Sequence, residues 1–97
     1  MNKSVLITGA SSGLGKDFAS LYAEKGYDLV LTARRESNLK SIASDLTSKY
    51  NISAAIIPAD LGEPQSPYKI FNFCEESNIK IDILINNAGY GLTGEFD

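Results

Sequence analysis

Short apolar runs alternate with longer segments of mixed polarity along the chain. The runs have the length of β-strands and are rich in Val, Ile, Leu and Ala, at residues 4–8, 29–31, 54–57 and 81–85. The segments between them have the length and the apolar spacing of helices. The pattern therefore predicts the order β-α-β-α-β-α-β, which is typical of an α/β protein with a parallel sheet.

The first helical segment is expected over residues 14–25, with Gly26 at the C′ position that ends it. Its predicted buried face consists of Leu14, Phe18, Leu21 and Tyr22. The second segment begins after a predicted N-cap at Ser37. Its predicted buried face consists of Leu39, Ile42, Ala43, Leu46 and Tyr50.

The third helix is predicted to follow Pro58, with Ser66 as N-cap and Pro67 as its first residue. Phe71 and Cys74 are expected to share its apolar face. Because crossovers between parallel strands are right-handed, the preferred arrangement is a doubly wound sheet with strand order 3-2-1-4. Ligands bind such sheets at the carboxyl ends of the strands, where the order reverses.

Composition narrows the possible functions. The 97 residues are 43% apolar and carry a net charge of −3, which fits a folded domain and argues against a basic nucleic-acid binder. There is no His and a single Cys, which argues against metal sites, Ser-His-Asp or Cys-His catalysis and an internal disulfide. The apolar runs are too short for a signal peptide or a membrane span. We expect a cytoplasmic protein with no metal, no nucleic-acid partner and no membrane partner.

A glycine-rich loop joins the first strand to the first helix, with Gly9, Gly13 and Gly15 in the spacing G-x-x-x-G-x-G. Gly9 permits a tight exit from the strand, Gly13 lets the backbone approach a diphosphate, and Gly15 lets the helix pack closely on the sheet. The start of the helix then faces an anion with its free N–H groups. Ser11 and Ser12 add hydroxyl donors. The alternative is that the glycines serve only the turn.

The second strand is followed by Arg34 and Arg35, with no carboxylate before Glu36. A carboxylate here would accept hydrogen bonds from the ribose 2′-OH of NAD, whereas guanidinium groups suit a 2′-phosphate. The sequence therefore predicts NADP(H) in preference to NAD(H). The alternative is that both arginines are solvated charges before the second helix.

Taken together, the glycine loop after Thr8, Asp60-Leu61 after the third strand, and Asn86-Asn87-Ala88-Gly89 after the fourth resemble the N-terminal half of a short-chain dehydrogenase/reductase. The resemblance covers essentially the whole chain. It implies a Rossmann-type domain, incomplete over residues 1–97, that binds a nicotinamide dinucleotide. It also implies hydride transfer between the nicotinamide and a small carbonyl or alcohol substrate.

The resemblance also implies roles for individual residues. The diphosphate would be bound by Gly9, Gly13, Leu14 and Gly15. Asp60 would accept a hydrogen bond from the adenine amino group, with Leu61 beside the ring, and Arg34 is the usual marker of NADP. The ribose side of the groove would be lined by Asn87, Ala88 and Gly89.

Several of these residues also have plainer interpretations. Asp60 could be a turn residue, and the asparagines could satisfy backbone groups at a strand end. Asp82 is interpreted as a strand-entry residue, Tyr90 as a surface aromatic that could lean over the groove, and Cys74 as a small buried apolar residue.

The catalytic Tyr-x-x-x-Lys motif of the family is absent, because none of the five tyrosines is followed by lysine four positions later. We therefore assign no catalytic residue and expect the 97 residues alone to be inactive. The alternatives are a non-catalytic dinucleotide-binding module and, less favoured by the glycine spacing, an extended relative such as a sugar-nucleotide epimerase. The apolar strand at 81–85 would be an open sheet edge, which predicts self-association and a homo-oligomer.

Overall fold

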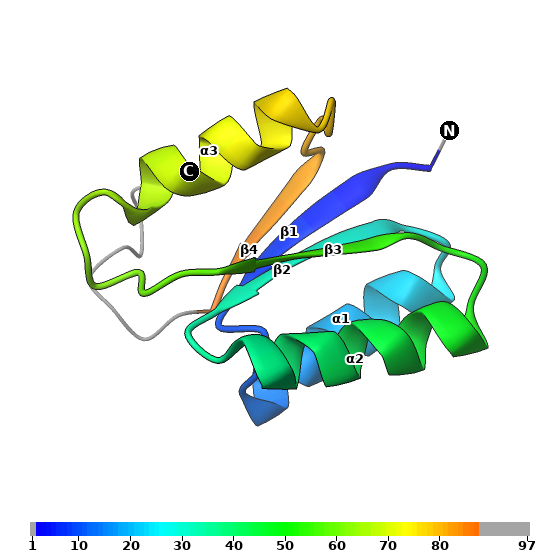
Figure 1. Cartoon of the computed structure of the whole chain (residues 1–97). Helices are drawn as coiled ribbons and strands as arrows, with labels where there is room; N and C mark the ends of the chain where they lie inside the picture. The colour runs from blue at the N-terminus through cyan, green and yellow to red at the C-terminus, as the bar shows by residue number, and fades with distance from the viewer. Residues whose placement is uncertain (1, 88–97) are drawn as a thin grey trace.

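The computed structural model of the chain describes residues 2–87. Seven elements follow one another as β1 (Ser4–Thr8), α1 (Gly13–Glu24), β2 (Asp28–Ala33), α2 (Glu36–Lys49), β3 (Ala54–Pro58), α3 (Ser66–Glu76) and β4 (Ile83–Asn86). The strands form one parallel sheet in the order β3-β2-β1-β4 (Figure 1). This confirms the predicted Rossmann-type α/β fold.

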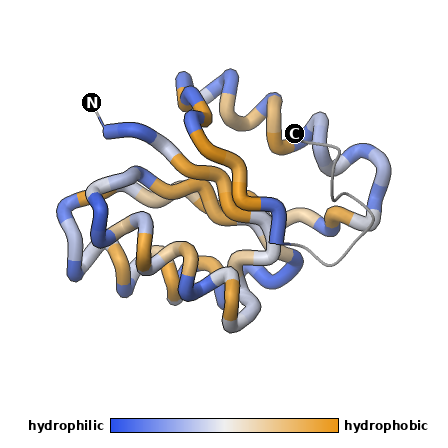
Figure 2. The backbone as a smooth tube through the Cα atoms, turned by 180° about the vertical axis from the view of Figure 1, so that it is seen from behind, coloured by the Kyte–Doolittle hydropathy of each residue, from blue (hydrophilic) through white to orange (hydrophobic). Residues whose placement is uncertain are grey.

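The helices form a layer on each side of the sheet. α1 and α2 cover one face and α3 covers the other (Figure 1). The chain moves from β1 to β3 in one direction across the sheet and then returns past β1 to β4, so right-handed crossovers put the last helix on the opposite face. The apolar strands lie between the two layers (Figure 2).

Each face of the sheet has its own apolar cluster. On the α1 and α2 side, the buried side chains include Val5, Ile7, Leu29, Leu31, Leu39, Ile42 and Leu46. On the α3 side they are Leu6, Val30, Ile57, Leu61, Ile70 and Cys74. Alternate residues of β1 and β2 thus point to opposite clusters, as the strand period requires. The predicted face of α2 is confirmed, with Ala43 and Tyr50 half-buried at its margin.

The prediction for α1 was wrong about which residues are buried. Gly15, Ala19 and Ala23 face the sheet, whereas Leu14 and Leu21 are 58% and 45% exposed. Phe18 and Tyr22 lie between these two faces and are half-buried. The cause is the close approach of α1 to the sheet, which only small side chains permit. The end of α1 is as predicted, with Gly26 at φ +89°.

Two predicted helix caps were also wrong. α2 begins at Glu36, so Ser37 lies inside the helix, and the N-cap Arg35 makes no side-chain capping bond. Glu36 supplies the negative charge that a first turn favours, and it pairs with Lys40 at 3.2 Å. α3 begins at Ser66 itself, after Gln65.

The buried face of α3 also differs from the prediction in part. Ile70 and Cys74 are each 5% exposed, but Phe71 is 57% exposed and lies at the margin of the apolar cluster. Ile70 and Cys74 are four residues apart and align along the helix, which places Phe71 one step around it. Cys74 is a buried apolar residue as predicted, and burial raises the pKa of its thiol above 9.0.

Candidate nucleotide-binding site

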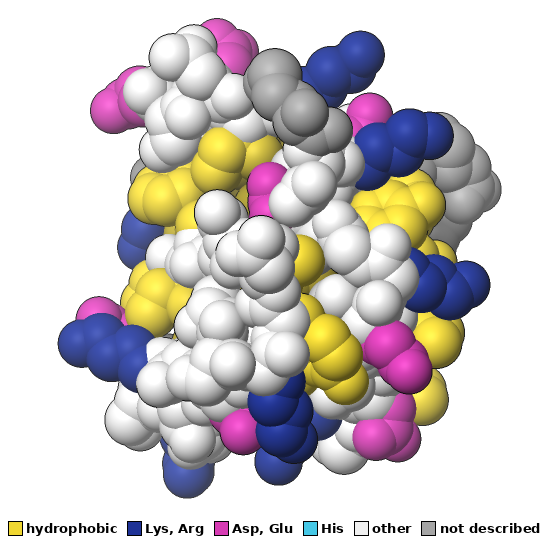
Figure 3. Space-filling model, turned by 90° about the vertical axis from the view of Figure 1, so that its right-hand side faces the viewer, with side chains coloured by type: hydrophobic (Ala, Val, Ile, Leu, Met, Phe, Trp, Pro, Cys, Tyr) yellow, Lys and Arg dark blue, Asp and Glu magenta, His cyan; other side chains and the backbone are white. Residues whose placement is uncertain are grey.

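The carboxyl ends of the strands bring together segments that are far apart in the sequence. The loop after β1, Arg34 and Arg35 after β2, Asp60 after β3 and Asn87 after β4 all follow strands that run in parallel. The opposite end of the molecule carries Lys, Arg, Asp and Glu side chains scattered among one another, with no single-sign patch (Figure 3). Because the strands are parallel, the predicted site residues lie together at the carboxyl end of the sheet.

The loop after β1 turns sharply at Gly9, whose φ of +63° is a left-handed conformation that glycine adopts readily. The carbonyl of Gly9 accepts from the Ser12 N–H at 3.1 Å and closes the turn. The next residue, Ala10, is fully buried, and its N–H donates to the Thr32 carbonyl at 3.1 Å. These bonds fix the loop to both central strands.

Ser12 is the N-cap of α1. Its Oγ accepts from the Gly15 N–H at 3.1 Å and donates its hydrogen to the Gly9 carbonyl at 2.9 Å. The sequence suggested a hydroxyl that donates to a ligand, but in the structure this hydrogen is already used within the loop. Ser11 is half-buried, and its hydroxyl makes no hydrogen bond with residues 2–87.

The first turn of α1 presents unused donors. Within the described residues, the backbone N–H groups of Gly13 and Leu14 have no acceptor, and no acidic residue lies in the first turn. Gly13 and Leu14 are both exposed, so a ligand can reach this turn from solvent. Free N–H groups at the positive end of a helix dipole favour an anion such as a diphosphate.

Gly15 allows a close approach, as the sequence predicted, but the contact shown is with the loop after β1 and not with the sheet. A Cβ on this residue would lie 2.2 Å from the Gly9 oxygen and 2.8 Å from the Ala10 Cα. Both are backbone atoms of the same loop, so no side-chain movement relieves the contact. Glycine at this position therefore allows the helix start and the loop to lie against each other.

The end of β4 is joined to β1 and to the glycine loop. The Asn87 N–H donates to Thr8 Oγ1 at 2.9 Å, and Thr8 Oγ1 is 3.0 Å from Asn86 Oδ1. The Asn87 side-chain amide donates to Ser12 Oγ at 2.8 Å and to the Gly9 carbonyl at 3.3 Å. Asn87 thus satisfies groups at a strand end and also reaches the candidate site. Ala88, Gly89 and Tyr90 lie outside the described residues.

Asp82 serves the other end of the same strand pair. Its carboxylate accepts from the Ser4 N–H at 2.9 Å, and its own N–H donates to the Ser4 carbonyl. These two bonds begin the β1–β4 pairing, so the strand-entry interpretation is confirmed.

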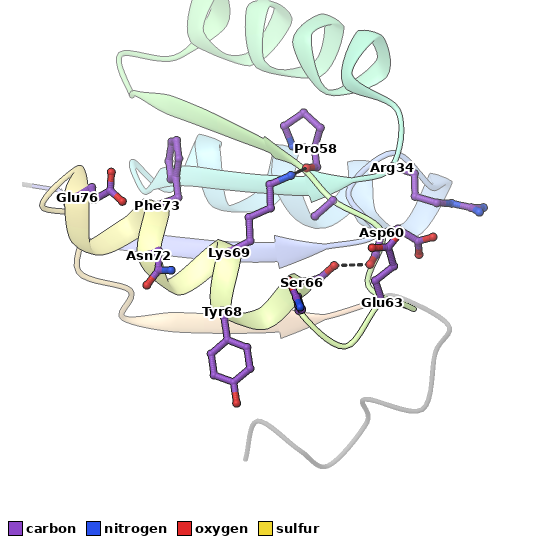
Figure 4. Close-up of a pocket in the computed structure, with 12 residues that line it drawn as sticks. Arg34, Pro58, Asp60, Glu63, Ser66, Tyr68, Lys69, Asn72, Phe73 and Glu76 are labelled. Carbon is purple, nitrogen blue, oxygen red and sulfur yellow. Dashed lines mark hydrogen bonds between the residues drawn. The ribbon is translucent and has the colours of Figure 1, made fainter.

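Arg34 and Arg35 are both exposed, and neither forms an ion pair within residues 2–87. Arg34 lies beside Asp60 at one end of an open groove of about 1170 Å³ between β3 and α3 (Figure 4). Its guanidinium points outward from this groove. In the groove, Lys69 Nζ donates to the Pro58 carbonyl at 3.1 Å.

Asp60 organises the loop after β3. Its Oδ1 accepts from the Gly62 N–H at 2.9 Å, and its carbonyl accepts from the Glu63 N–H and the Ser66 hydroxyl. Asp60 is therefore a turn residue, while its Oδ2 makes no hydrogen bond with the described residues. Leu61 is only 7% exposed, and its side chain belongs to the apolar cluster on the α3 side of the sheet.

Sequence reasoning missed the bond between Asn87 and Ser12. The two residues are 75 positions apart, and no local pattern in either segment signals the contact. The order of the strands contains the only clue, because it places β4 beside β1.

Other kinds of site find no support in the described residues. They contain no group of three or more His, Cys, Asp or Glu side chains that could hold a metal ion. None of the three helices there is long and apolar enough to cross a lipid bilayer.

Comparison with known proteins gives a consistent result. Residues 3–97 match the family described as short chain dehydrogenase. The chain is 43% identical over 86 residues to a very-long-chain 3-oxoacyl-CoA reductase of Candida glabrata, covering 87% of this chain and 24% of the relative. It is 41% identical over 91 residues to an NADP-dependent 3-hydroxy acid dehydrogenase of Schizosaccharomyces pombe, covering 93% of this chain and 35% of the relative.

Solved structures agree with these matches. A short-chain dehydrogenase from Sphingobium yanoikuyae in complex with NADPH superimposes with a TM-score of 0.81 at 40% identity, covering 90% of this chain and 34% of that one. L-sorbose reductase from Gluconobacter frateurii, complexed with NADPH and L-sorbose, gives a TM-score of 0.87 at 33% identity, covering 93% of this chain and 34% of that one. The chain thus spans about a quarter to a third of the length of these proteins.

Proposed function

This chain belongs to the short-chain dehydrogenase family, and on that basis we propose that it is the cofactor-binding portion of an NADP-dependent oxidoreductase. The observation that carries the proposal is the pair of free N–H groups of Gly13 and Leu14, two exposed residues in the first turn of α1. A cofactor diphosphate would accept from both groups. The bound nicotinamide would supply the hydride chemistry.

The residues of the loop divide into two groups under this proposal. Gly13 and Leu14 contact the diphosphate through their backbone, and Ser11 has a hydroxyl available for the same purpose. Gly9, Ser12 and Gly15 hold the loop in shape through the bonds and the close contact described above.

We propose NADP(H) rather than NAD(H) as the cofactor. Arg34 and Arg35 are exposed at the end of β2, and within the described residues neither has a carboxylate partner. Both can therefore turn to a 2′-phosphate without first breaking an ion pair. The two solved relatives named above are both complexes with NADPH, which supports the same choice.

The adenine end of the cofactor is proposed to lie near Asp60. The unused Oδ2 of this carboxylate can accept from the adenine amino group while Oδ1 keeps its bond to the Gly62 N–H. Because the Leu61 side chain is buried, we expect Leu61 to contribute through its backbone. Asn87, Ala88 and Gly89 complete the proposed set on the ribose side.

The substrate is proposed to be a small molecule with a carbonyl or alcohol group, and residues 1–97 contribute no catalytic residue to the reaction. Relatives named as reductases of 3-oxoacyl-CoA and of sulfoacetaldehyde suggest compounds to try first. A cytoplasmic location and a homo-oligomer remain proposals. The second candidate function is a dinucleotide-binding module without catalysis.

Isothermal titration of the intact protein with NADPH and NADH tests the cofactor. We expect NADPH to bind at least about tenfold more tightly, which corresponds to about 1.4 kcal/mol. Equal or tighter binding of NADH would contradict the proposal. Oxidation of NADPH with a panel of 3-oxoacyl-CoA and aldehyde substrates, measured on the whole protein of which residues 1–97 are proposed to be the cofactor-binding portion, then separates the enzyme from the non-catalytic module, since the module would bind cofactor without turnover.

A further inference from the structure

The side-chain amide of Asn87 has a defined orientation at the glycine loop. Its nitrogen lies 2.8 Å from Ser12 Oγ and 3.3 Å from the Gly9 carbonyl oxygen. A carbonyl oxygen can only accept, so the NH₂ group and not Oδ1 must face the loop. The backbone of Asn87 is held as well, because its N–H donates to Thr8 Oγ1 at 2.9 Å.

The Ser12 hydroxyl uses all of its hydrogen-bonding capacity in this arrangement. A hydroxyl has one hydrogen to donate and two lone pairs that accept. Here the hydrogen goes to the Gly9 carbonyl, and the lone pairs accept from the Gly15 N–H and the Asn87 amide. The hydroxyl therefore cannot rotate towards a ligand without losing one of these bonds.

The residues that follow this hydroxyl are the ones whose N–H groups are free. Gly13 and Leu14 come directly after Ser12, and a glycine-rich segment has little conformational preference of its own. What fixes the direction of these N–H groups is the cap at Ser12, and one of the three bonds at that cap comes from Asn87, the residue directly after β4.

We propose that Asn87 is a positioning residue for the diphosphate site, acting through the Ser12 hydroxyl on the N–H groups of Gly13 and Leu14. The inference rests on the proposed function and deepens it. Instead of touching the cofactor with its amide, Asn87 ties the end of β4 to the helix start that binds the diphosphate. Cofactor affinity then depends on a contact between segments 75 residues apart.

The experiment compares two ligands on the intact protein. NADPH carries the diphosphate, whereas adenosine 2′-monophosphate reaches only the region of Arg34 and Asp60. We expect Asn87→Ala to weaken NADPH binding about tenfold, the effect of losing one or two hydrogen bonds, and to change adenosine 2′-monophosphate binding less than about twofold. Asn87→Asp should weaken NADPH further, because it puts a carboxylate beside the diphosphate. Asn51→Ala, an exposed control at the amino end of β3, should change neither.

A double-mutant cycle between Asn87 and Ser12 tests whether Asn87 affects NADPH binding through the Ser12 hydroxyl. Ser12→Ala should weaken NADPH binding at least as much as Asn87→Ala, because it removes all three bonds of the hydroxyl. The double variant should bind NADPH no more weakly than Ser12→Ala alone, because Asn87 then has no hydroxyl to act through. Ser12→Thr keeps the hydroxyl and should retain affinity within about twofold, which shows that the hydroxyl and not the size of the side chain matters. Where Asn87→Ala folds poorly, Asn87→Asp and the Asn87→Asp/Ser12→Ala double variant make the same comparison.

The outcomes separate this inference from the function on which it rests. Wild-type affinity in Asn87→Ala, equal losses for both ligands, or additive losses in the double variant would each overturn the positioning role. A wild-type protein that binds no NADPH would overturn the proposed function, and the inference with it.

Discussion

Gly15 and Gly9 lie so close that a Cβ on Gly15 would stand 2.2 Å from the Gly9 carbonyl oxygen. This contact brings the start of α1 against the loop that leaves β1. It explains why the small side chains of Ala19 and Ala23, and not the leucines of α1, face the sheet. The position of the candidate anion site thus depends on Gly15 having no Cβ atom.

Gly15→Ala should therefore damage both stability and binding. We expect a loss of about 1–3 kcal/mol in the free energy of unfolding, as for other overpacked sites, measured by urea denaturation. NADPH affinity should fall as well, since α1 must move away from the loop.

Gly13→Ala is the matched control, because its Cβ would meet nothing within 4 Å. We expect its stability to be unchanged or raised by up to about 1 kcal/mol, given the higher helix propensity of Ala. NADPH binding should still weaken, because the methyl group enters the space proposed for the diphosphate. Full NADPH affinity in Gly13→Ala would place the diphosphate elsewhere.

Arg34→Ala should separate the two cofactors. The side chain is exposed and unpaired within the described residues, so we expect stability to change by less than about 0.5 kcal/mol. NADPH affinity should fall about tenfold while NADH affinity stays the same, since only NADPH carries the 2′-phosphate. Lys49→Ala, at the far end of α2, is a control for the general loss of positive charge. Parallel losses for NADPH and NADH would count against a 2′-phosphate site at Arg34.

Thr32→Val tests a buried hydrogen bond beneath the site. Thr32 is fully buried, and its Oγ1 donates to the Ile57 carbonyl at 2.6 Å. Valine keeps the shape but removes the donor, so we expect a loss of about 1–2 kcal/mol in the free energy of unfolding. Thr32→Ser keeps the donor and removes a methyl group, which separates the hydrogen bond from packing. An unchanged urea midpoint in Thr32→Val would show that the bond does not stabilise the sheet.

Cys74 should make stability depend on pH in the alkaline range. Burial raises the pKa of the folded thiol above 9.0, so the unfolded chain loses this proton first as the pH rises. The contribution of the Cys74 thiol to the free energy of unfolding is complete below the pKa of the thiol in the unfolded chain. It is lost as the pH rises towards the pKa of the thiol in the folded protein. We expect the difference in stability between wild type and Cys74→Ala to shrink above pH 9 in urea denaturation series. The stability of both proteins at pH 7 is the reference. A difference in stability between them that stays constant up to pH 10 would contradict the raised pKa.

The sequence predicted the strand order and the elements well, because strand-sized apolar runs and a single sheet topology leave few alternatives. It failed at Leu14 and Leu21, where spacing alone favours large side chains and the close approach of α1 selects small ones. It also misplaced the caps at Ser37 and Ser66. Helix starts depend on which hydrogen bond a hydroxyl makes, and Ser66 donates to the Asp60 carbonyl instead of accepting from its own helix.

The candidate site was predictable as a set of residues but not as a network. Gly13, Arg34 and Asp60 follow their strands in the sequence, so the parallel topology alone brings them to one edge. The hydrogen bond from the Asn87 amide to the Ser12 hydroxyl was not predictable. It depends on the direction of the hydroxyl hydrogen, which points to the Gly9 carbonyl and leaves a lone pair for Asn87.

The bond from Lys69 to the Pro58 carbonyl has a consequence for the outer side of the sheet. β3 pairs only with β2 among the described residues, so its other side is open to a strand from a neighbouring molecule. At the carboxyl end of β3, however, Pro58 has no N–H to offer, and its carbonyl already accepts from a charged side chain of α3. A foreign strand would find no donor at Pro58 and would have to share its carbonyl with the Lys69 ammonium, which makes edge-to-edge pairing at this end of β3 less favourable.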